Sequence, residues 1–292
     1  MAFTPSGGGI LKCGIVTDST CSLEPEVLEK YNIHLVSLYI NRDGKYTKAI
    51  EIDPKEYSKE MLDSSFSALT SQPSPNDFFE VFEKIKAECD CILVPVISAK
   101  LSGTYSSALV AAEMVDIPVK VIDSKLTSYA LGSLAISLRK LADEGRPLEE
   151  LLEYANQFYK KVRIIFSVDS LDYLYRGGRI GKAKVLIGSL LNLKPLIELS
   201  DGELKAAGTI RGNKKLLEKL FSLATMPMAR HELKSVRILS VNRPDDSELL
   251  LKKLKSNFNN VETFVSTIEP VVLTHLGPSV IGIITEWREK SL

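Results

Sequence analysis

The sequence predicts an α/β protein with two domains: a parallel-sheet N-terminal domain and a smaller C-terminal domain with a mixed sheet. At 292 residues, the chain is near the upper size of a single hydrophobic core. In the first half, apolar runs of strand length alternate with helical patterns, which favours a parallel sheet with right-handed crossovers. In the second half, strands flank a hairpin turn near Asp201-Gly202. We expect a disordered leader at 1–11, the N-terminal domain at 12–161 and the C-terminal domain at 162–292.

Local signals define the elements of the N-terminal domain. Asp53-Pro54-Lys55-Glu56 supplies a cap, a proline at the first helical position and an acid three residues after the cap. Residues 91–97 are continuously apolar, as in a strand covered on both faces. The expected strands are residues 13–17, 33–40, 91–97 and 119–122. The expected helices start after Ser22, Asp53, Ser74 and Arg146 and also span residues 105–115 and 126–144.

The C-terminal domain has a different pattern, in which strands and helices do not alternate regularly. We expect a helix over residues 245–255. The expected strands are residues 162–168, 196–199, 203–206, 235–241 and 261–266.

Three loops rich in Ser and Thr follow strands of the predicted parallel sheet. They are residues 17–20, 98–104 and 124–128. The carboxyl ends of parallel strands meet at one edge of the sheet, and ligands of such sheets bind there. The sequence therefore predicts a ligand site at this edge.

Composition excludes several classes of protein. Lys plus Arg and Asp plus Glu are each 37, so the electrostatic attraction that dominates binding to nucleic acids and anionic membranes is missing. The four cysteines, Cys13, Cys21, Cys89 and Cys91, are expected to be buried and reduced, and no metal site or cofactor is expected. No stretch reaches the roughly 20 apolar residues of a membrane span. We expect a cytoplasmic protein that does not bind nucleic acid.

Motifs of catalytic machinery are missing from the sequence: there is no G-x-S-x-G, Walker loop, G-x-G-x-x-G or H-E-x-x-H. Ser102 lies at a strand-to-helix turn, where a serine is more often a helix N-cap than a nucleophile. Thr70 lies in a polar turn, Arg211 before a helix and His275 beside a tight turn. Each of these residues has a structural explanation when taken alone.

Taken in order, several segments resemble the DegV family of bacterial fatty-acid-binding proteins. They are Val16-Thr17-Asp18-Ser19-Thr20, Thr70-Ser71-Gln72-Pro73-Ser74, Leu101-Ser102-Gly103-Thr104-Tyr105, Asp123-Ser124-Lys125, Arg176-Gly177-Gly178-Arg179-Ile180 and His275-x-Gly277-Pro278. The resemblance covers residues 13–287. It implies one long-chain fatty acid, such as palmitate, held between the two domains. It also implies that the carboxylate is presented to a separate fatty acid kinase, which makes an acyl phosphate for phospholipid metabolism.

The resemblance also assigns roles to residues. Thr70 and Ser102 match carboxylate-binding hydroxyls, and Arg211 and His275 match basic residues near the head group. The neighbours of these residues in the head-group loops are Ser71, Ser98 and Gly103. We expect Arg176 and Arg179 to form an exposed surface where the kinase docks.

The sequence departs from the family pattern at two places. The family commonly has Ser-Gly at the position of Ala99-Lys100, so a bulky cation stands near the head-group loop. Ser279 stands where a Gly-rich run is common. The first departure leaves carboxylate binding intact but bears on how this loop meets a kinase.

A carrier role fits this chemistry, because a sixteen-carbon tail contributes on the order of 12 kcal/mol before ordering costs, at ~0.8 kcal/mol per buried CH₂. The head-group residues then need only prevent the carboxylate from being buried unpaired. Transient contact with a membrane is compatible with this role. Two alternatives stay open: a serine-dependent hydrolase or acyltransferase using Ser102 and His275, and a carrier of another amphiphilic acid.

Overall fold

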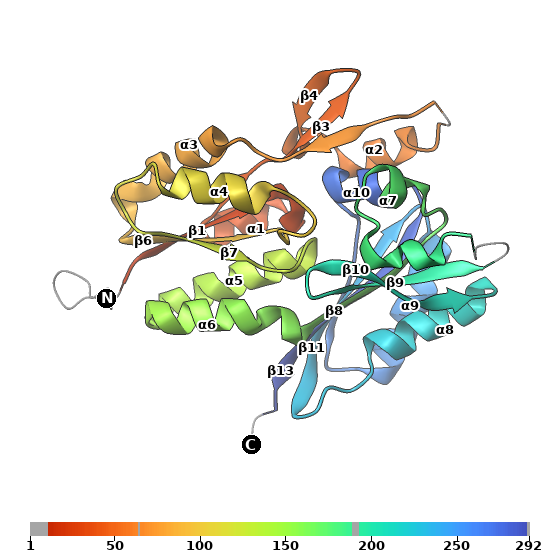
Figure 1. Cartoon of the computed structure of the whole chain (residues 1–292). Helices are drawn as coiled ribbons and strands as arrows, with labels where there is room; N and C mark the ends of the chain where they lie inside the picture. The colour runs from red at the N-terminus through yellow and green to blue at the C-terminus, as the bar shows by residue number, and fades with distance from the viewer. Residues whose placement is uncertain (1–10, 64, 189–192, 291–292) are drawn as a thin grey trace. The chain divides into compact units, whose positions relative to one another are not determined.

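Two compact units make up the chain (Figure 1). The computed structural model describes residues 11–63, 65–188 and 193–290, so residues 1–10 of the expected leader lie outside it. The first unit comprises residues 11–39, 47–50 and 70–159, and the second comprises residues 40–46, 51–69 and 160–290. A single division near residue 161 therefore leaves out two earlier segments, 40–46 and 51–69, which contact the second half of the chain.

The first unit is built on a four-stranded parallel sheet in the order β2-β1-β6-β7. Its strands are β1 (Cys13–Asp18), β2 (Ile33–Val36), β6 (Cys91–Val96) and β7 (Val119–Asp123). Its helices are α1 (Pro25–Lys30), α3 (Pro75–Ile85), α4 (Thr104–Ala112), α5 (Tyr129–Asp143) and α6 (Leu148–Phe158). All six side chains of β6 are buried, as expected for a central strand covered by helices on both faces.

Helices α3 and α4 pack together on one face of this sheet, and α5 and α6 pack together on the other (Figure 1). Phe78 and Phe82 of α3 are fully buried against Val94 and Val96 of β6. Ser74 begins α3 with a capping box, in which its side chain bonds the backbone of Asp77 and Asp77 bonds back. This confirms the helix start predicted at Ser74.

The second unit contains a six-stranded mixed sheet in the order β10-β9-β8-β13-β11-β12. Its strands are β8 (Val162–Val168), β9 (Lys194–Ser200), β10 (Glu203–Ile210), β11 (His231–Val241), β12 (Glu262–Ser266) and β13 (Val280–Glu289). Its helices are α2 (Pro54–Glu60), α7 (Asp172–Arg176), α8 (Asn213–Ala224), α9 (Pro244–Asn257) and α10 (Pro270–Leu276). Leucines of α8 and α9 form a core with Ile281 and Ile283 of β13.

A third, three-stranded sheet in the order β4-β3-β5 lies where the chain passes from one unit to the other. It contains β3 (Tyr39–Arg42), β4 (Lys45–Lys48) and β5 (Leu69–Ser71). The strand predicted over 33–40 is thus two strands. At the break, the side chain of Ser37 donates to the carbonyl oxygen of Leu38 over 2.7 Å, and the same oxygen accepts from the backbone N–H of Ala49 over 2.9 Å.

The helix predicted directly after Ser22 begins later, at Pro25. Asp18 caps a short 3₁₀ turn over Ser19–Cys21, and Ser22 ends that turn in the left-handed region at φ 52°. The prediction was wrong because Ser22 closes one element and does not open the next.

Candidate ligand-binding site

The three Ser/Thr-rich loops lie at the carboxyl ends of β1, β6 and β7, as predicted. The buried carboxylate of Asp18 joins two of them: Oδ1 accepts from the backbone N–H of Thr20 over 2.9 Å, and Oδ2 accepts from that of Ile97 over 2.6 Å. Burial raises the pKa of Asp18, and the hydrogen bonds from Thr20 and Ile97 oppose this. The third loop is tied in by Asp123, which accepts from the backbone of Ala99 over 3.0 Å.

Ser102 lies in a tight loop that leads into α4. Its backbone N–H donates to the carbonyl oxygen of Ser98 over 3.1 Å. Its hydroxyl lies 2.9 Å from that of Thr104 and accepts from the backbone N–H of Thr104 over 3.3 Å. The helix N-cap itself is Gly103, one residue later than the serine cap that the sequence favoured. The half-buried Ser102 hydroxyl can therefore bond an incoming carboxylate oxygen without leaving a buried donor unpaired.

Thr70 is the middle residue of β5 and does not lie in a turn, so the polar turn expected there was wrong. The segment directly after β5 is joined to the Ser102 loop by a residue that sequence reasoning missed, Gln72. Its amide Nε2 donates to the carbonyl oxygen of Gly103 over 3.2 Å and to the hydroxyl of Ser107 over 2.9 Å. A Cβ at position 103 would lie 1.9 Å from Oε1 of Gln72, so the glycine makes room for this side chain. The signal in the sequence was a glycine directly after the candidate serine, together with a long amide in the Thr70 motif.

His275 lies in the second unit, in the last turn of α10, and packs against α7. Two glycines allow this contact. A Cβ on Gly177, at the end of α7, would lie 2.2 Å from Nδ1 of His275. A Cβ on Gly277 would lie 2.6 Å from the ring of Tyr173, and Gly277 has φ +86°, which favours glycine. The Arg-Gly-Gly-Arg and His-x-Gly-Pro motifs therefore form one packed structure.

A cavity of about 110 Å³ lies beside His275. Its lining includes Tyr173, Arg176 and a short stretch of chain that ends at Leu69. All of these lining residues belong to the second unit.

His275 is uncharged at neutral pH. Burial, with a smaller contribution from the nearby cation of Arg179, lowers its pKa to about 4. The resemblance placed His275 among the basic residues near the head group, but the packing that holds the ring also removes it from water. The imidazole can donate or accept a hydrogen bond here, but it brings no positive charge at pH 7.

The three arginines expected near the head group or at a docking surface, Arg211, Arg176 and Arg179, occupy different environments in the second unit. Arg211 is exposed in the turn between β10 and α8, next to Gly212 at φ +85°. Arg176 is exposed. Arg179 is half-buried, so the exposed pair that we expected was wrong for this residue, whose Nη1 donates to the carbonyl oxygen of Gly177 over 2.7 Å. Of the four residues expected near a carboxylate, Thr70 and Ser102 belong to the first unit and Arg211 and His275 to the second.

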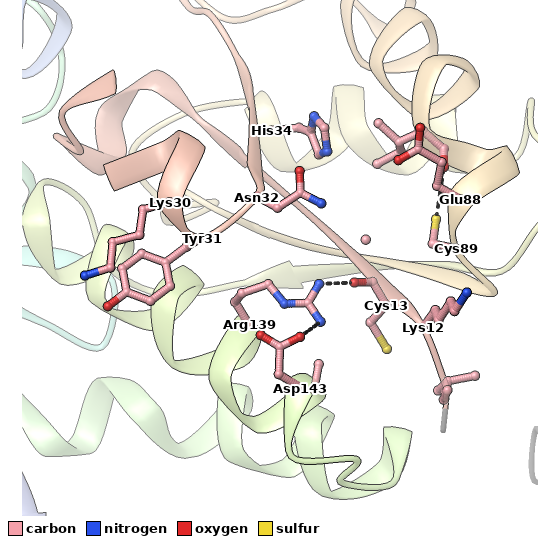
Figure 2. Close-up of a pocket in the computed structure, with 14 residues that line it drawn as sticks. Lys12, Cys13, Lys30, Tyr31, Asn32, His34, Glu88, Cys89, Arg139 and Asp143 are labelled. Carbon is pink, nitrogen blue, oxygen red and sulfur yellow. Dashed lines mark hydrogen bonds and ion pairs between the residues drawn. The ribbon is translucent and has the colours of Figure 1, made fainter. Parts of the chain in front are cut away.

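A second cavity, of about 450 Å³, lies in the first unit by the start of β1 (Figure 2). Lys12, Cys13, Cys89 and Arg139 line it, and Arg139 bonds Asp143 over 2.5 Å. The cavity lies at the amino ends of the strands and not at the edge with the Ser/Thr-rich loops. Cys89 is only half-buried, which differs from our expectation that all four thiols are buried.

Within the described residues, no cluster of His, Cys, Asp and Glu is suited to hold a metal ion. Over the same part of the chain, no helix is both long and apolar enough to span a membrane.

Comparison with known proteins identifies the family. The profile described as "Uncharacterised protein, DegV family" matches residues 12–287. The chain belongs to the DegV family. The resemblance seen in the motifs is therefore confirmed over nearly the whole chain.

DegV proteins of known structure share the fold. A fatty-acid-binding DegV protein from Thermus thermophilus is 33% identical, with a TM-score of 0.86 over 94% of this chain and 99% of that one. A stearic-acid-binding protein from Eubacterium ventriosum is 27% identical, with a TM-score of 0.84 over 93% and 97%. The fatty acid-binding protein of Thermotoga maritima is 32% identical over 288 residues, which is 96% of this chain and 99% of the relative. The predicted α/β architecture, with a parallel-sheet and a mixed-sheet unit, is confirmed.

Proposed function

We propose that this DegV protein binds one long-chain fatty acid and that the hydroxyls of Thr70 and Ser102 bond its carboxylate. The observation that carries the proposal is the Gln72 amide, which ties the Thr70 segment to the Ser102 loop through Gly103 and Ser107. Two hydroxyls of separate chain segments are thereby held in one region. The fatty-acid-binding relatives named above support the choice of ligand.

The chemistry of the residues fits binding and needs no activated nucleophile. Within the described chain, the Ser102 hydroxyl forms its hydrogen bonds with Thr104, which is not a base. A hydroxyl in this state is a good hydrogen-bond donor to a carboxylate and a poor nucleophile. The apolar tail supplies most of the affinity, and the hydroxyls fix the position of the head group.

In this proposal, an arginine supplies the positive charge near the carboxylate. His275 is neutral at pH 7, so it would act as a hydrogen-bonding group. Arg211 is permanently charged and exposed, and it is the candidate to compensate the partly desolvated carboxylate.

We further propose that the protein presents the carboxylate to a separate fatty acid kinase, which forms the acyl phosphate. The family resemblance suggests this role. The half-buried Ser102 and the exposed Ala99-Lys100 pair leave the head-group loop open to a partner. In the second unit, Arg176 is exposed and lines the His275 cavity, and it is our candidate for contact with the kinase. A transient membrane contact for loading the acid is part of the same proposal.

Two measurements test the ligand assignment. Organic extraction of the purified protein followed by mass spectrometry should yield a long-chain fatty acid. The double variant Thr70→Val with Ser102→Ala should remain folded and release labelled palmitate faster, since each lost bond to a charged group costs about 1.5–3 kcal/mol. Ser106→Ala, an exposed serine of α4, is the matched control and should behave as wild type. Unchanged retention in the double variant would refute the head-group assignment, and covalent labelling of Ser102 by a sulfonyl fluoride would favour the hydrolase instead.

A further inference from the structure

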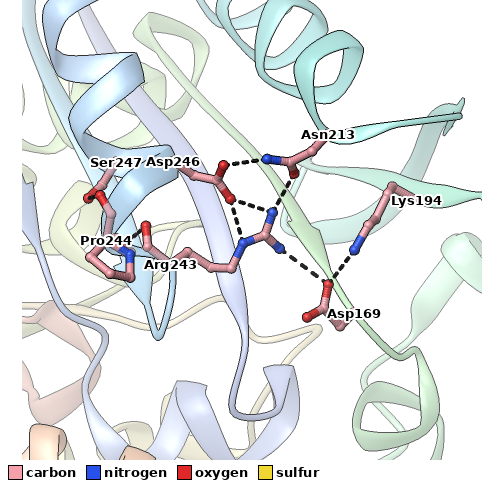
Figure 3. Close-up of polar contacts among 8 residues, drawn as sticks. Asp169, Lys194, Asn213, Arg243, Pro244, Asp246 and Ser247 are labelled. Atoms are coloured by element: carbon pink, nitrogen blue, oxygen red, sulfur yellow. Dashed lines mark hydrogen bonds and ion pairs between the residues drawn. The ribbon is translucent and has the colours of Figure 1, made fainter.

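A dense polar network centred on Arg243 lies at one end of the strands of the six-stranded sheet (Figure 3). Nε and Nη2 of Arg243 contact the same carboxylate oxygen of Asp246 at 2.5 Å. Nη1 donates to Asp169 over 3.2 Å, and Nη2 donates to the side-chain oxygen of Asn213 over 2.7 Å. Asn213 also donates to Asp246, and Lys194 donates to Asp169 over 2.8 Å.

The network joins the ends of five strands. Asp169 follows β8, Arg243 follows β11, and Lys194 begins β9. Asn213 is the first residue of α8, two residues after Arg211 at the end of β10. Ser279, just before β13, bonds the side chain of Asp169.

Asn242, the residue next to Arg243, contacts the loop that follows His275. Nδ2 of Asn242 donates to the carbonyl oxygen of Pro278 over 2.7 Å, within the His-x-Gly-Pro motif. The loop of Arg211 and the loop after His275 are therefore anchored to neighbouring residues, 243 and 242.

The centre of the network, Arg243 with Asp246, is largely buried, whereas Asp169 and Lys194 are partly exposed. The side chain of Arg243 is only 13% exposed and that of Asp246 only 9%. Two cations, Arg243 and Lys194, balance two carboxylates, Asp169 and Asp246, so removing one member leaves a partner unpaired. The guanidinium fork fixes direction as well as distance, which lysine cannot do.

We propose that Arg243, acting through Asn213, is a positioning residue that holds the Arg211 turn in place for a bound carboxylate. This inference rests on the proposed function. Arg211 itself is exposed and follows a β-strand, while Gly212 at φ +85° gives the turn freedom. The bond from Arg243 to Asn213 is the anchor next to that flexible glycine.

The test uses the whole protein loaded with palmitate that carries ¹³C at its carboxyl carbon. NMR measures the pKa of the bound carboxyl, and exchange measures the release rate. Arg211→Gln should raise the carboxyl pKa, because a nearby cation is lost. Asn213→Ala changes no charge and alters an exposed side chain, yet it should raise the carboxyl pKa too and speed release about three- to tenfold. Arg243→Lys should act in the same direction.

A double-mutant cycle separates positioning from general stability. In the Arg211→Gln background, Asn213→Ala should have no further effect. Amide hydrogen exchange at residues 209–213 of the ligand-free protein should rise in Asn213→Ala by more than the loss of global unfolding free energy accounts for. Arg288→Gln, which breaks an exposed ion pair with Glu232 on β11, is the control.

The outcomes distinguish a failure of the positioning role from a failure of the proposed function. Equal effects of Asn213→Ala with and without Arg211 would overturn the positioning role, as would an unchanged carboxyl pKa in Asn213→Ala when Arg211→Gln shifts it. If Arg211→Gln itself changes neither quantity, then the assignment of Arg211 in the proposed function fails, and the positioning role fails with it. If the wild-type protein does not retain palmitate, the proposed function fails, whereas the hydrogen-exchange result still tests the anchor.

Discussion

Acidification from pH 7 to pH 5 is expected to destabilise the protein through His275. The ring is packed beside Gly177, and burial together with the Arg179 cation lowers its pKa from 6.5 to about 4. In the unfolded chain the same histidine takes up a proton below pH 6.5, whereas in the folded chain it stays neutral down to about pH 4. The unfolded state therefore binds more protons in this window, and stability falls as the pH falls.

The size of the effect follows from the shift. One pKa unit corresponds to about 1.4 kcal/mol, and pH 5 lies more than halfway from 6.5 to 4. His275 should account for a loss of about 2 kcal/mol of unfolding free energy between pH 7 and pH 5. The loss should level off as the pH falls below about 4, where the folded protein also binds the proton.

Urea unfolding at a series of pH values measures this. His275→Gln cannot titrate, so its unfolding free energy should fall by about 2 kcal/mol less than that of the wild type over the same range. His34 also has a lowered pKa and contributes to the pH dependence of both proteins. The comparison is therefore between the slopes of unfolding free energy against pH and not between absolute stabilities. His231→Gln serves as a control for the loss of a histidine. Parallel slopes for wild type and His275→Gln would refute the buried, neutral state of the ring.

Two further predictions concern the motifs. Gly103→Ala should displace the Gln72 amide from its bonds to Gly103 and Ser107, lowering the unfolding free energy by about 1 kcal/mol and speeding palmitate release. Adding Gln72→Ala to that variant should cost nothing more, and a further full loss would show that the two residues act independently. Reversing the charge of the exposed Arg176 should slow acyl-phosphate formation by a fatty acid kinase and leave palmitate retention unchanged, because steering acts on the association rate. Normal kinase rates in that variant would locate docking elsewhere.

The sequence was most informative where local rules decide the structure. The helix start at Ser74 follows from side chains within three residues, and the loop after β6 follows from a strand-length apolar run. Motif residues such as Ser102 could be picked out because their family pattern is local too. These are short-range properties, so they can be read along the chain.

Contacts between distant residues could not be read in this way. The bond from Gln72 to Gly103 spans 31 residues and depends on how a strand and a helix meet. The charge state of His275 depends on its burial, and the sequence shows only a histidine beside a turn. Residues 51–69 belong to the second unit through contacts such as the hydrogen bond between the hydroxyls of Tyr57 and Thr274. These two residues are 217 positions apart in the sequence.

The two glycine recesses described above give helices α7 and α10 a mechanical property. Each helix receives a ring from the other, His275 into the space at Gly177 and Tyr173 into the space at Gly277. Such a two-way interlock resists sliding and rotation of either helix alone, because both rings would have to leave their recesses together. A change in the position of α7 would therefore also change the surroundings of the imidazole on α10.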